Sequence, residues 1–264
     1  MEQVKENISA QKLRGGYYTP QAIADFLCQW SIDKNTKRIL EPSCGDGNFI
    51  ESAILRFKEL GIEGEDLEGR IKGIELLEEE SLKAKARAAN FGLNSNTIVN
   101  NDFFHYISSN GVAKYDAVIG NPPFIRYQSF PEEHRKLAIE MMQKLGLKPN
   151  KLTNIWVPFL VVSASLMKNH GRMAMVIPAE LFQVKYAAET RVFLSKFFER
   201  ITIITFKKLV FANIQQEVVL LLCEKKVQHG KGVRVIEYEN LDELKSINFK
   251  AINGSHVKSI DHTT

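Results

Sequence analysis

The segment that most constrains the fold is a short apolar run that ends abruptly in a rigid turn. Residues Tyr115–Ile119 are followed at once by Gly120-Asn121-Pro122-Pro123-Phe124. A short apolar run bounded by glycine and proline is typical of a buried strand, because proline fixes φ and removes a backbone donor. An asparagine held between a strand end and two prolines is suited to binding a planar amine. The sequence therefore predicts a buried strand whose carboxyl end carries a polar and aromatic binding turn.

Further apolar runs alternate with segments of helical periodicity along most of the 264-residue chain. The expected strands lie at residues 38–41, 71–75, 97–99, 115–119, 172–177, 201–206 and 218–222. The expected helices lie at residues 20–30, 48–60, 78–91, 132–146, 154–168 and 190–198. This alternation predicts an α/β fold in which helices cover both faces of a mostly parallel, seven-stranded sheet. The connection between the last two strands is too short for a crossover helix, so we expect a C-terminal antiparallel strand pair.

Other parts of the chain have weaker patterns. Asn169-His170-Gly171 is expected to form a turn before the fifth strand, and residues 233–236 are compatible with the start of another strand. Because the pattern weakens after Glu224, we assign residues 1–225 to one folded domain. Residues 226–264 are expected to form a linker or the start of a further region.

Composition narrows the class of protein. The net charge of +4 is compatible with a nucleic-acid partner without requiring one. The three cysteines, Cys28, Cys44 and Cys223, are far apart and have no metal-ligand spacing, so we expect no metal site and a reducing compartment. No apolar run approaches the roughly 20 residues needed to span a bilayer. The polar N-terminus does not resemble a signal peptide, and we therefore expect a cytoplasmic protein that does not bind membranes.

Acidic side chains stand at the ends of three successive predicted strands. Glu41 opens the turn Glu41-Pro42-Ser43-Cys44-Gly45-Asp46-Gly47, in which the glycines allow the backbone to approach a ligand closely. A carboxylate at this point repels a pyrophosphate but attracts an ammonium group, which favours a ligand with adenosine and amino-acid moieties over a dinucleotide. Glu75 can accept hydrogen bonds from ribose hydroxyls. Asp102 can accept one from an adenine amino group, and Phe103 can cover the adenine ring.

These motifs, in this order, resemble the gamma arrangement of S-adenosylmethionine-dependent DNA adenine-N6 methyltransferases from restriction–modification systems. Gly15-Gly16-Tyr17-Tyr18-Thr19-Pro20 is similar to their N-terminal cofactor motif, and Glu41–Phe49 is similar to the motif after their first strand. Asn121–Phe124 resembles their catalytic tetrapeptide, and Ile125–Gln128 resembles its common continuation. The resemblance covers residues 13–225. It implies a Rossmann-like class I methyltransferase fold, with residues 1–225 as the catalytic domain.

The resemblance also implies roles for individual residues. The implied cofactor-binding residues are Tyr18, Thr19, Glu41, Ser43, Gly45, Gly47, Glu75, Leu76, Asp102, Phe103 and Asn121. Thr19, Glu41 and Ser43 are expected at the methionine part, Glu75 and Leu76 at the ribose and adenine, and Asp102 and Phe103 around the adenine. The implied catalytic residues are Asn121, Pro122, Pro123 and Phe124, and Phe211 is expected to stack on the other face of the target base. Phe124 stands where the family often has tyrosine, which keeps ring stacking and excludes a role for a phenolic hydroxyl.

The implied reaction is methyl transfer from S-adenosylmethionine to the N6 amino group of an adenine flipped out of double-stranded DNA. Arg126, Lys207 and Lys208 are candidate phosphate contacts. Two alternatives stay open. A methyltransferase of the same fold could act on RNA or on a protein glutamine, because a turn of asparagine, two prolines and an aromatic residue also suits an amide nitrogen. The chain could also be a module that is inactive without a separate or missing target-recognition domain.

Overall fold

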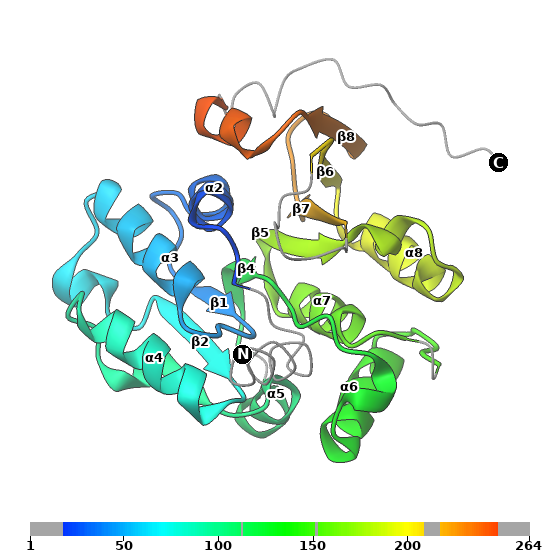
Figure 1. The fold of residues 1–264 in the computed structure, drawn as a ribbon, viewed down its shortest axis with the longest axis horizontal. Coiled ribbons are helices and arrows are strands. Elements are labelled where there is room, and N and C mark those ends of the chain that lie inside the picture. Colours follow the sequence, from blue (N-terminus) through cyan, green and yellow to red (C-terminus); the bar gives the residue numbers. More distant parts are fainter. Residues whose placement is uncertain (1–17, 112, 151–152, 209–216, 248–264) are drawn as a thin grey trace, which may run out of the picture.

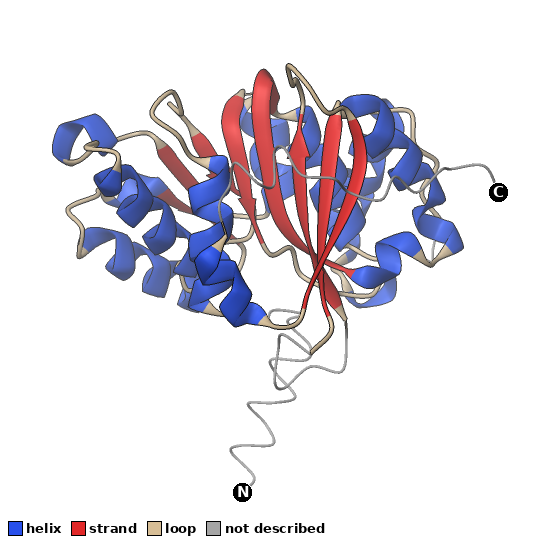
Figure 2. Ribbon diagram, turned by 90° about the horizontal axis from the view of Figure 1, so that it is seen from above, coloured by secondary structure: helices blue, strands red, loops and turns tan. Residues whose placement is uncertain are grey.

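The sheet and helices of the computed structural model form three layers, and the structure describes residues 18–111, 113–150, 153–208 and 217–247. Eight strands form one sheet in the order β3-β2-β1-β4-β5-β7-β6-β8. Helices lie on both faces of this sheet (Figures 1 and 2). The sequence correctly predicted this α/β class and its mostly parallel sheet. Within the described part of the chain, no helix is long and apolar enough to cross a membrane.

The bounds of the elements follow the predicted alternation closely. The strands are β1 (Ile39–Glu41), β2 (Ile71–Glu75), β3 (Ile98–Asn100), β4 (Tyr115–Gly120), β5 (Met167–Pro178), β6 (Arg200–Phe206), β7 (Val218–Glu224) and β8 (Gly232–Tyr238). The helices are α2 (Gln21–Ser31), α3 (Asn48–Glu59), α4 (Glu78–Ala89), α5 (Phe103–Asn110), α6 (Glu132–Lys144), α7 (Trp156–Ser165) and α8 (Ala188–Phe197). Short 3₁₀ helices lie at Gly64–Leu67, Ser95–Thr97, Tyr127–Ser129, Ala179–Phe182, Lys185–Ala187 and Leu241–Ser246.

Strand β7 runs against its neighbours, whereas all the other pairs are parallel. It pairs antiparallel with both β5 and β6, which confirms the predicted antiparallel pair. The predicted count of seven strands is wrong, because β8 pairs in parallel with β6 along its whole length. β8 is an edge strand with half-exposed side chains, so its sequence lacks the apolar run that marks the central strands. The sheet thus continues beyond residue 225, and the division into domains stays a prediction.

The core has two halves, one on each face of the sheet. Helices α2, α3 and α4 pack on one face, and α5, α6, α7 and α8 pack on the other. Strand β7 illustrates the alternation that fills both halves: Val218, Leu220 and Leu222 join the first cluster, and Val219, Leu221 and Cys223 join the second. Burial on both faces explains why the central strands are continuous apolar runs.

Two local features differ from the sequence-based expectation. Helix α5 was not predicted, although Asp102 provides an N-cap whose carboxylate accepts a hydrogen bond from the His105 backbone N–H at 2.8 Å. The expected turn at residues 169–171 lies inside β5, where the pairing with β4 shifts register between Tyr115 and Ala117. A strand irregularity and a turn both favour small and polar residues, so sequence pattern alone does not separate them.

Two glycines allow a close approach of backbone and side chains, one at the end of β4 and one at the start of α3. Gly120 ends β4 with φ of 146°, and a Cβ there would lie 3.3 Å from Cγ of Glu41. Gly47 caps α3 with φ of 89°, and its Cβ would lie 2.9 Å from the Cα of Ala84 on α4. A side chain at residue 47 therefore meets backbone that cannot move without displacing α4.

We expect Gly47→Ala to lower the free energy of unfolding by about 3 kcal/mol, because it adds left-handed backbone strain to a clash with a helix backbone. The matched control is Gly92→Ala. Gly92 has φ of 84°, but the space where its Cβ would stand holds no described atom within 4 Å. The control should lose only about 1 kcal/mol. Urea unfolding of both variants measures the difference, and equal losses would contradict the packing argument.

Candidate functional site

A cavity of about 340 Å³ opens at the carboxyl ends of β1, β2 and β4. Ligands bind at this edge in open α/β sheets, because the loops there diverge to either face. The structure brings most of the predicted site residues to this cavity. They are Tyr18, Thr19, Glu41, Ser43, Gly45, Glu75, Leu76, Asp102, Phe103, Asn121 and Pro123. Segments more than one hundred residues apart thus converge on one site.

Three of the remaining predicted residues, Gly47, Pro122 and Phe124, do not line this cavity. Gly47 stands behind the cavity wall as the N-cap of α3. Pro122 is buried, and Phe124 is half-buried between the two core clusters. Phe211 lies outside the described residues, so its expected position beside the target base stays a prediction.

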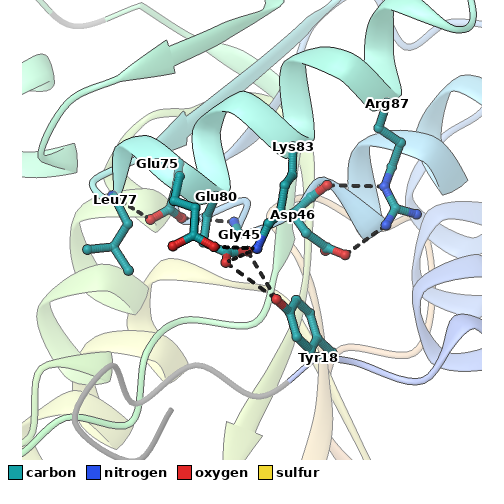
Figure 3. Close-up of polar contacts among 9 residues, drawn as sticks. Tyr18, Gly45, Asp46, Glu75, Leu77, Glu80, Lys83 and Arg87 are labelled. Atoms are coloured by element: carbon teal, nitrogen blue, oxygen red, sulfur yellow. Dashed lines mark hydrogen bonds and ion pairs between the residues drawn. The ribbon is translucent and has the colours of Figure 1, made fainter. Parts of the chain in front are cut away.

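Glu75 ends β2 and holds the glycine turn in place. Its Oε2 accepts a hydrogen bond from the Gly45 N–H, and its Oε1 accepts one from the Leu77 N–H, both at 2.8 Å (Figure 3). Burial raises the pKa of Glu75, whereas these backbone hydrogen bonds lower it. Each carboxylate oxygen has a second lone pair, so Glu75 can still accept hydrogen bonds from a ligand in the cavity.

Glu41 ends β1 in a different environment. It is only 1% exposed, and its Oε2 has no hydrogen-bond partner among the described residues. Burial raises the pKa of Glu41 well above its usual range, and the nearby charges of Glu75 and Asp46 raise it further. A buried carboxylate without compensation is costly, and this kind of environment is typical of functional sites. The arrangement attracts a cationic group to the inner end of the cavity.

A small polar network fixes Asn121 against the N-terminal segment. The Asn121 Nδ2 donates to Thr19 Oγ1 at 3.2 Å, and Ser43 Oγ donates to the Asn121 backbone oxygen at 3.4 Å. Asn48 Nδ2 donates to the Thr19 backbone oxygen at 2.7 Å. Thr19 precedes α2, Ser43 follows β1, and Asn48 begins α3. The position of Asn121 therefore depends on the correct folding of all three segments.

The rim of the cavity contains a residue whose role the sequence did not indicate. The first turn of α4 reads as solvent-facing, but Glu80 is only 7% exposed and lines the cavity. Its carboxylate accepts a hydrogen bond from the Tyr18 hydroxyl at 3.2 Å and pairs with Lys83 at 2.9 Å (Figure 3). Farther along α4, Arg87 pairs with Asp46 at 2.7 Å. These contacts attach the N-terminal segment and the glycine turn to α4.

Aromatic side chains form the apolar wall of the cavity. Phe103 begins α5 and stacks on Phe159 of α7, with ring centroids 5.2 Å apart. Phe130 also lines the cavity and meets Phe104 edge-on at 6.4 Å. Phe159 and Phe130 were not predicted, because an apolar residue within an apolar segment carries no local signal of a ligand. The cavity therefore combines carboxylates on one side with a flat apolar surface on the other.

The candidate phosphate contacts lie at the surface. Arg126 and Lys208 are exposed, and Lys207 forms an ion pair with Glu239 of the segment after β8. None of these three residues lines the cavity. Their role in phosphate binding therefore stays a prediction.

Comparison with known proteins gives a consistent result. A family model described as N-6 DNA methylase matches residues 3–264. The chain is 27% identical over 236 residues to the type II methyltransferase M.AccI of Acinetobacter calcoaceticus, covering 86% of this chain and 41% of that relative. It is 25% identical over 248 residues to the type II methyltransferase M.HincII of Haemophilus influenzae, covering 92% of this chain and 43% of that relative. The chain thus spans less than half the length of these relatives.

Solved structures support the fold. The cryoEM structure of a DrdV–DNA complex matches with a TM-score of 0.73 at 17% sequence identity, covering 97% of this chain and 31% of that chain. At this level of identity the likeness shows a shared fold.

We expect Glu41→Gln to raise the free energy of unfolding of the ligand-free protein by about 1–2 kcal/mol near neutral pH. Because the pKa of Glu41 is raised on folding, the folded chain binds more protons than the unfolded chain between the two pKa values. Stability of the wild type should therefore fall as pH rises through this window. The glutamine variant lacks this slope, so its advantage grows with pH in urea unfolding experiments.

Glu75→Gln is the matched control for this prediction. Both oxygens of Glu75 accept backbone N–H groups, so one of them would face the new amide NH₂ group instead. This variant should lose about 1–3 kcal/mol. A loss of stability in Glu41→Gln similar to that of the control would contradict the assignment of Glu41 as an uncompensated charge.

Proposed function

The chain belongs to the N-6 DNA methylase family, and we propose that it methylates the N6 amino group of an adenine flipped out of double-stranded DNA. One observation carries the proposal: Asn121 and Pro123 of the turn after β4 border the same cavity as Glu41, Glu75 and Asp102. A group that can hold a planar amine thus lies beside a site with the charges expected of a methyl-donor pocket. The named type II methyltransferases among the relatives support a role in restriction–modification.

S-Adenosylmethionine is the proposed cofactor, and the residues present fit it. The buried Oε2 of Glu41 without a partner in the described chain offers a negative charge to the methionine ammonium group, with Thr19 and Ser43 beside it. Glu75 and Leu76 would hold the ribose and adenine, and Asp102 and Phe103 would complete the adenine pocket. Tyr18, Gly45, Gly47 and Asn121 complete the proposed cofactor-binding residues, with Gly47 behind the wall. When bound, the cofactor supplies an electrophilic methyl group.

Asn121 and Pro122 are proposed to hold the target amine. An exocyclic amine on adenine is a poor nucleophile, because its lone pair is delocalised into the ring. The Asn121 side-chain oxygen and the Pro122 carbonyl can each accept one amino hydrogen, which favours a tetrahedral nitrogen with a localised lone pair. The Nδ2 of Asn121 already donates to Thr19, and this contact fixes which end of the amide is the acceptor.

The two prolines and Phe124 complete the proposed target-base site. Pro122 and Pro123 restrict the backbone and remove N–H groups that would compete for the acceptors. The rate enhancement then comes from positioning and hydrogen bonding. Flipping a base costs about a few kcal/mol, and stacking on an aromatic ring returns roughly 1–3 kcal/mol. Stacking of the flipped base on both Phe124 and Phe211 would therefore offset the free-energy cost of flipping better than stacking on one ring.

Target recognition is proposed to depend on more than these residues. The relatives are more than twice as long as the segment that this chain matches. We therefore propose that a region or polypeptide other than the domain at residues 1–225 selects the DNA sequence. The cysteines Cys28, Cys44 and Cys223 are free and buried, which is consistent with the proposed cytoplasmic location.

The proposed reaction can be tested by transfer of labelled methyl from S-adenosylmethionine to DNA, RNA and protein pools. We expect the label in DNA as N6-methyladenine. Asn121→Ala should lower kcat at saturating cofactor by about 100-fold or more, because it removes a hydrogen-bond acceptor for the amine. Label in RNA or in protein glutamine would instead move the function to the alternative acceptors.

Asn48→Ala is the matched control for Asn121→Ala. Asn48 also contacts Thr19, but it belongs to α3 and has no proposed contact with the target base. This variant should raise the KM for the cofactor and leave kcat nearly unchanged. A similar fall of kcat in both variants would mean that Asn121 acts only through the cofactor site.

A second prediction tests base flipping. Phe211→Ala should slow methylation of duplex DNA more than methylation of mismatched or single-stranded sites, because those sites cost less to unstack. The loss on duplex should be about 10-fold larger, which corresponds to roughly one stacking contact. Steady-state kinetics on matched oligonucleotides measure the ratio. Equal losses on all substrates would contradict a stacking role for Phe211.

A further inference from the structure

The segment after the Asn121 turn forms part of the wall of the proposed cofactor cavity. Asn121 and Pro123 line this cavity, and so do Ile125, Ser129 and Phe130. Helix α6 begins directly afterwards, at Glu132. One continuous stretch of chain therefore holds the proposed target-base site and forms part of the cofactor-site wall. The attachment of this stretch to the rest of the site then matters for both ligands.

His134, in the first turn of α6, provides such an attachment. Its Nδ1 lies 2.9 Å from Oδ2 of Asp102, whose other oxygen caps α5. The Phe130 ring meets the imidazole edge-on, with centroids 5.9 Å apart. Nδ1 is buried and makes no directional hydrogen bond within the described structure. The contact with Asp102 is therefore mainly electrostatic.

Asp102 forms part of a wall between two cavities. It lines the proposed cofactor cavity, and with Leu76 and Asn101 it also lines a neighbouring cavity of about 420 Å³. His134 lines only the neighbouring cavity. The imidazole thus does not border the cofactor cavity, and it contacts the Asp102 carboxylate, which does.

This geometry has a chemical consequence. A carboxylate can only accept hydrogen bonds, so favourable contact requires a proton on the His134 Nδ1. Asp102 is only 4% exposed, and a buried carboxylate that loses a polar contact is destabilised or changes its position. His134 therefore favours a single orientation of Asp102, which presents the carboxylate to the cofactor cavity.

We propose that His134 is a positioning residue, which holds Asp102 as the acceptor for the adenine amino group of the cofactor. The inference rests on the proposed function, because it assigns adenine to the Asp102 end of the cavity. It adds a residue of α6 that does not touch the cofactor. The role differs from simple packing, because it depends on a proton donor near the position of Nδ1.

The test is calorimetric binding of S-adenosylhomocysteine to the full chain and to single variants. We expect His134→Ala to weaken binding by about 10-fold, as for loss of a contact to a charged group. His134→Asn should restore most of the affinity, because its amide places an N–H near the original Nδ1. His105→Ala is the matched control. His105 lines the same neighbouring cavity but contacts Asp102 through its backbone N–H, so its affinity should equal that of the wild type.

A double-mutant cycle separates positioning from general packing. If His134 acts through Asp102, then His134→Ala should change affinity less than 2-fold in an Asp102→Asn background, against about 10-fold alone. The inference is overturned if His134→Ala binds like the wild type, if His134→Asn loses as much as His134→Ala, or if the two losses simply add. Failure of the wild type to bind S-adenosylhomocysteine would overturn the proposed function itself, and the inference with it.

Discussion

The parallel pairing of β1 with both β2 and β4 is the constraint on which the rest of the structure depends. Backbone pairing sets Glu41 beside Gly73 of β2, and it places the ends of β1 and β4 at the same edge. The chain leaves β3 at one side of the sheet and re-enters it at β4, so the connections on either side of β1 diverge to opposite faces. A crevice must form at this point. The cavity, its carboxylates and the Asn121 turn all follow from that topology.

The cavity carries a cost in stability that its chemistry explains. Glu41 and Glu75 are both buried, but their carboxylates differ in the hydrogen bonds that they accept. Two backbone N–H groups donate hydrogen bonds to Glu75 and partly offset the cost of its burial, and these bonds also hold the glycine turn in place. Glu75 therefore has a structural role with or without a ligand. Glu41 has no such compensation for Oε2 in the described chain. If this position served only the stability of the fold, an uncharged residue would be favoured there. A carboxylate is favoured instead if the position binds a cation.

The sequence predicted structure best where the role of a residue depends on its neighbours in the sequence. The central strands are apolar on both faces, and Asn121 follows a strand end directly, so these features could be predicted from their neighbours alone. For β8 the sequence indicated only the possible start of a strand at residues 233–236, because its place in the sheet depends on pairing with β6. The role of Glu80 could not be predicted, because it depends on Tyr18, sixty-two positions away. The same holds for the register shift in β5, which reflects its partner strand. Local sequence predicts the groups at a site better than it predicts their contacts.

That distinction bears on how the proposed reaction is achieved. If the rate enhancement comes from positioning, then the important quantity is the relative placement of two ligands and not the reactivity of any side chain. Asn121 is fixed by Thr19 and Ser43, which also line the proposed cofactor site. The stretch that follows Asn121 is in turn attached to Asp102 through His134. The proposed cofactor site and the proposed target-base site therefore share residues that hold them in position. A ligand that restricts motion at one site then also restricts motion at the other.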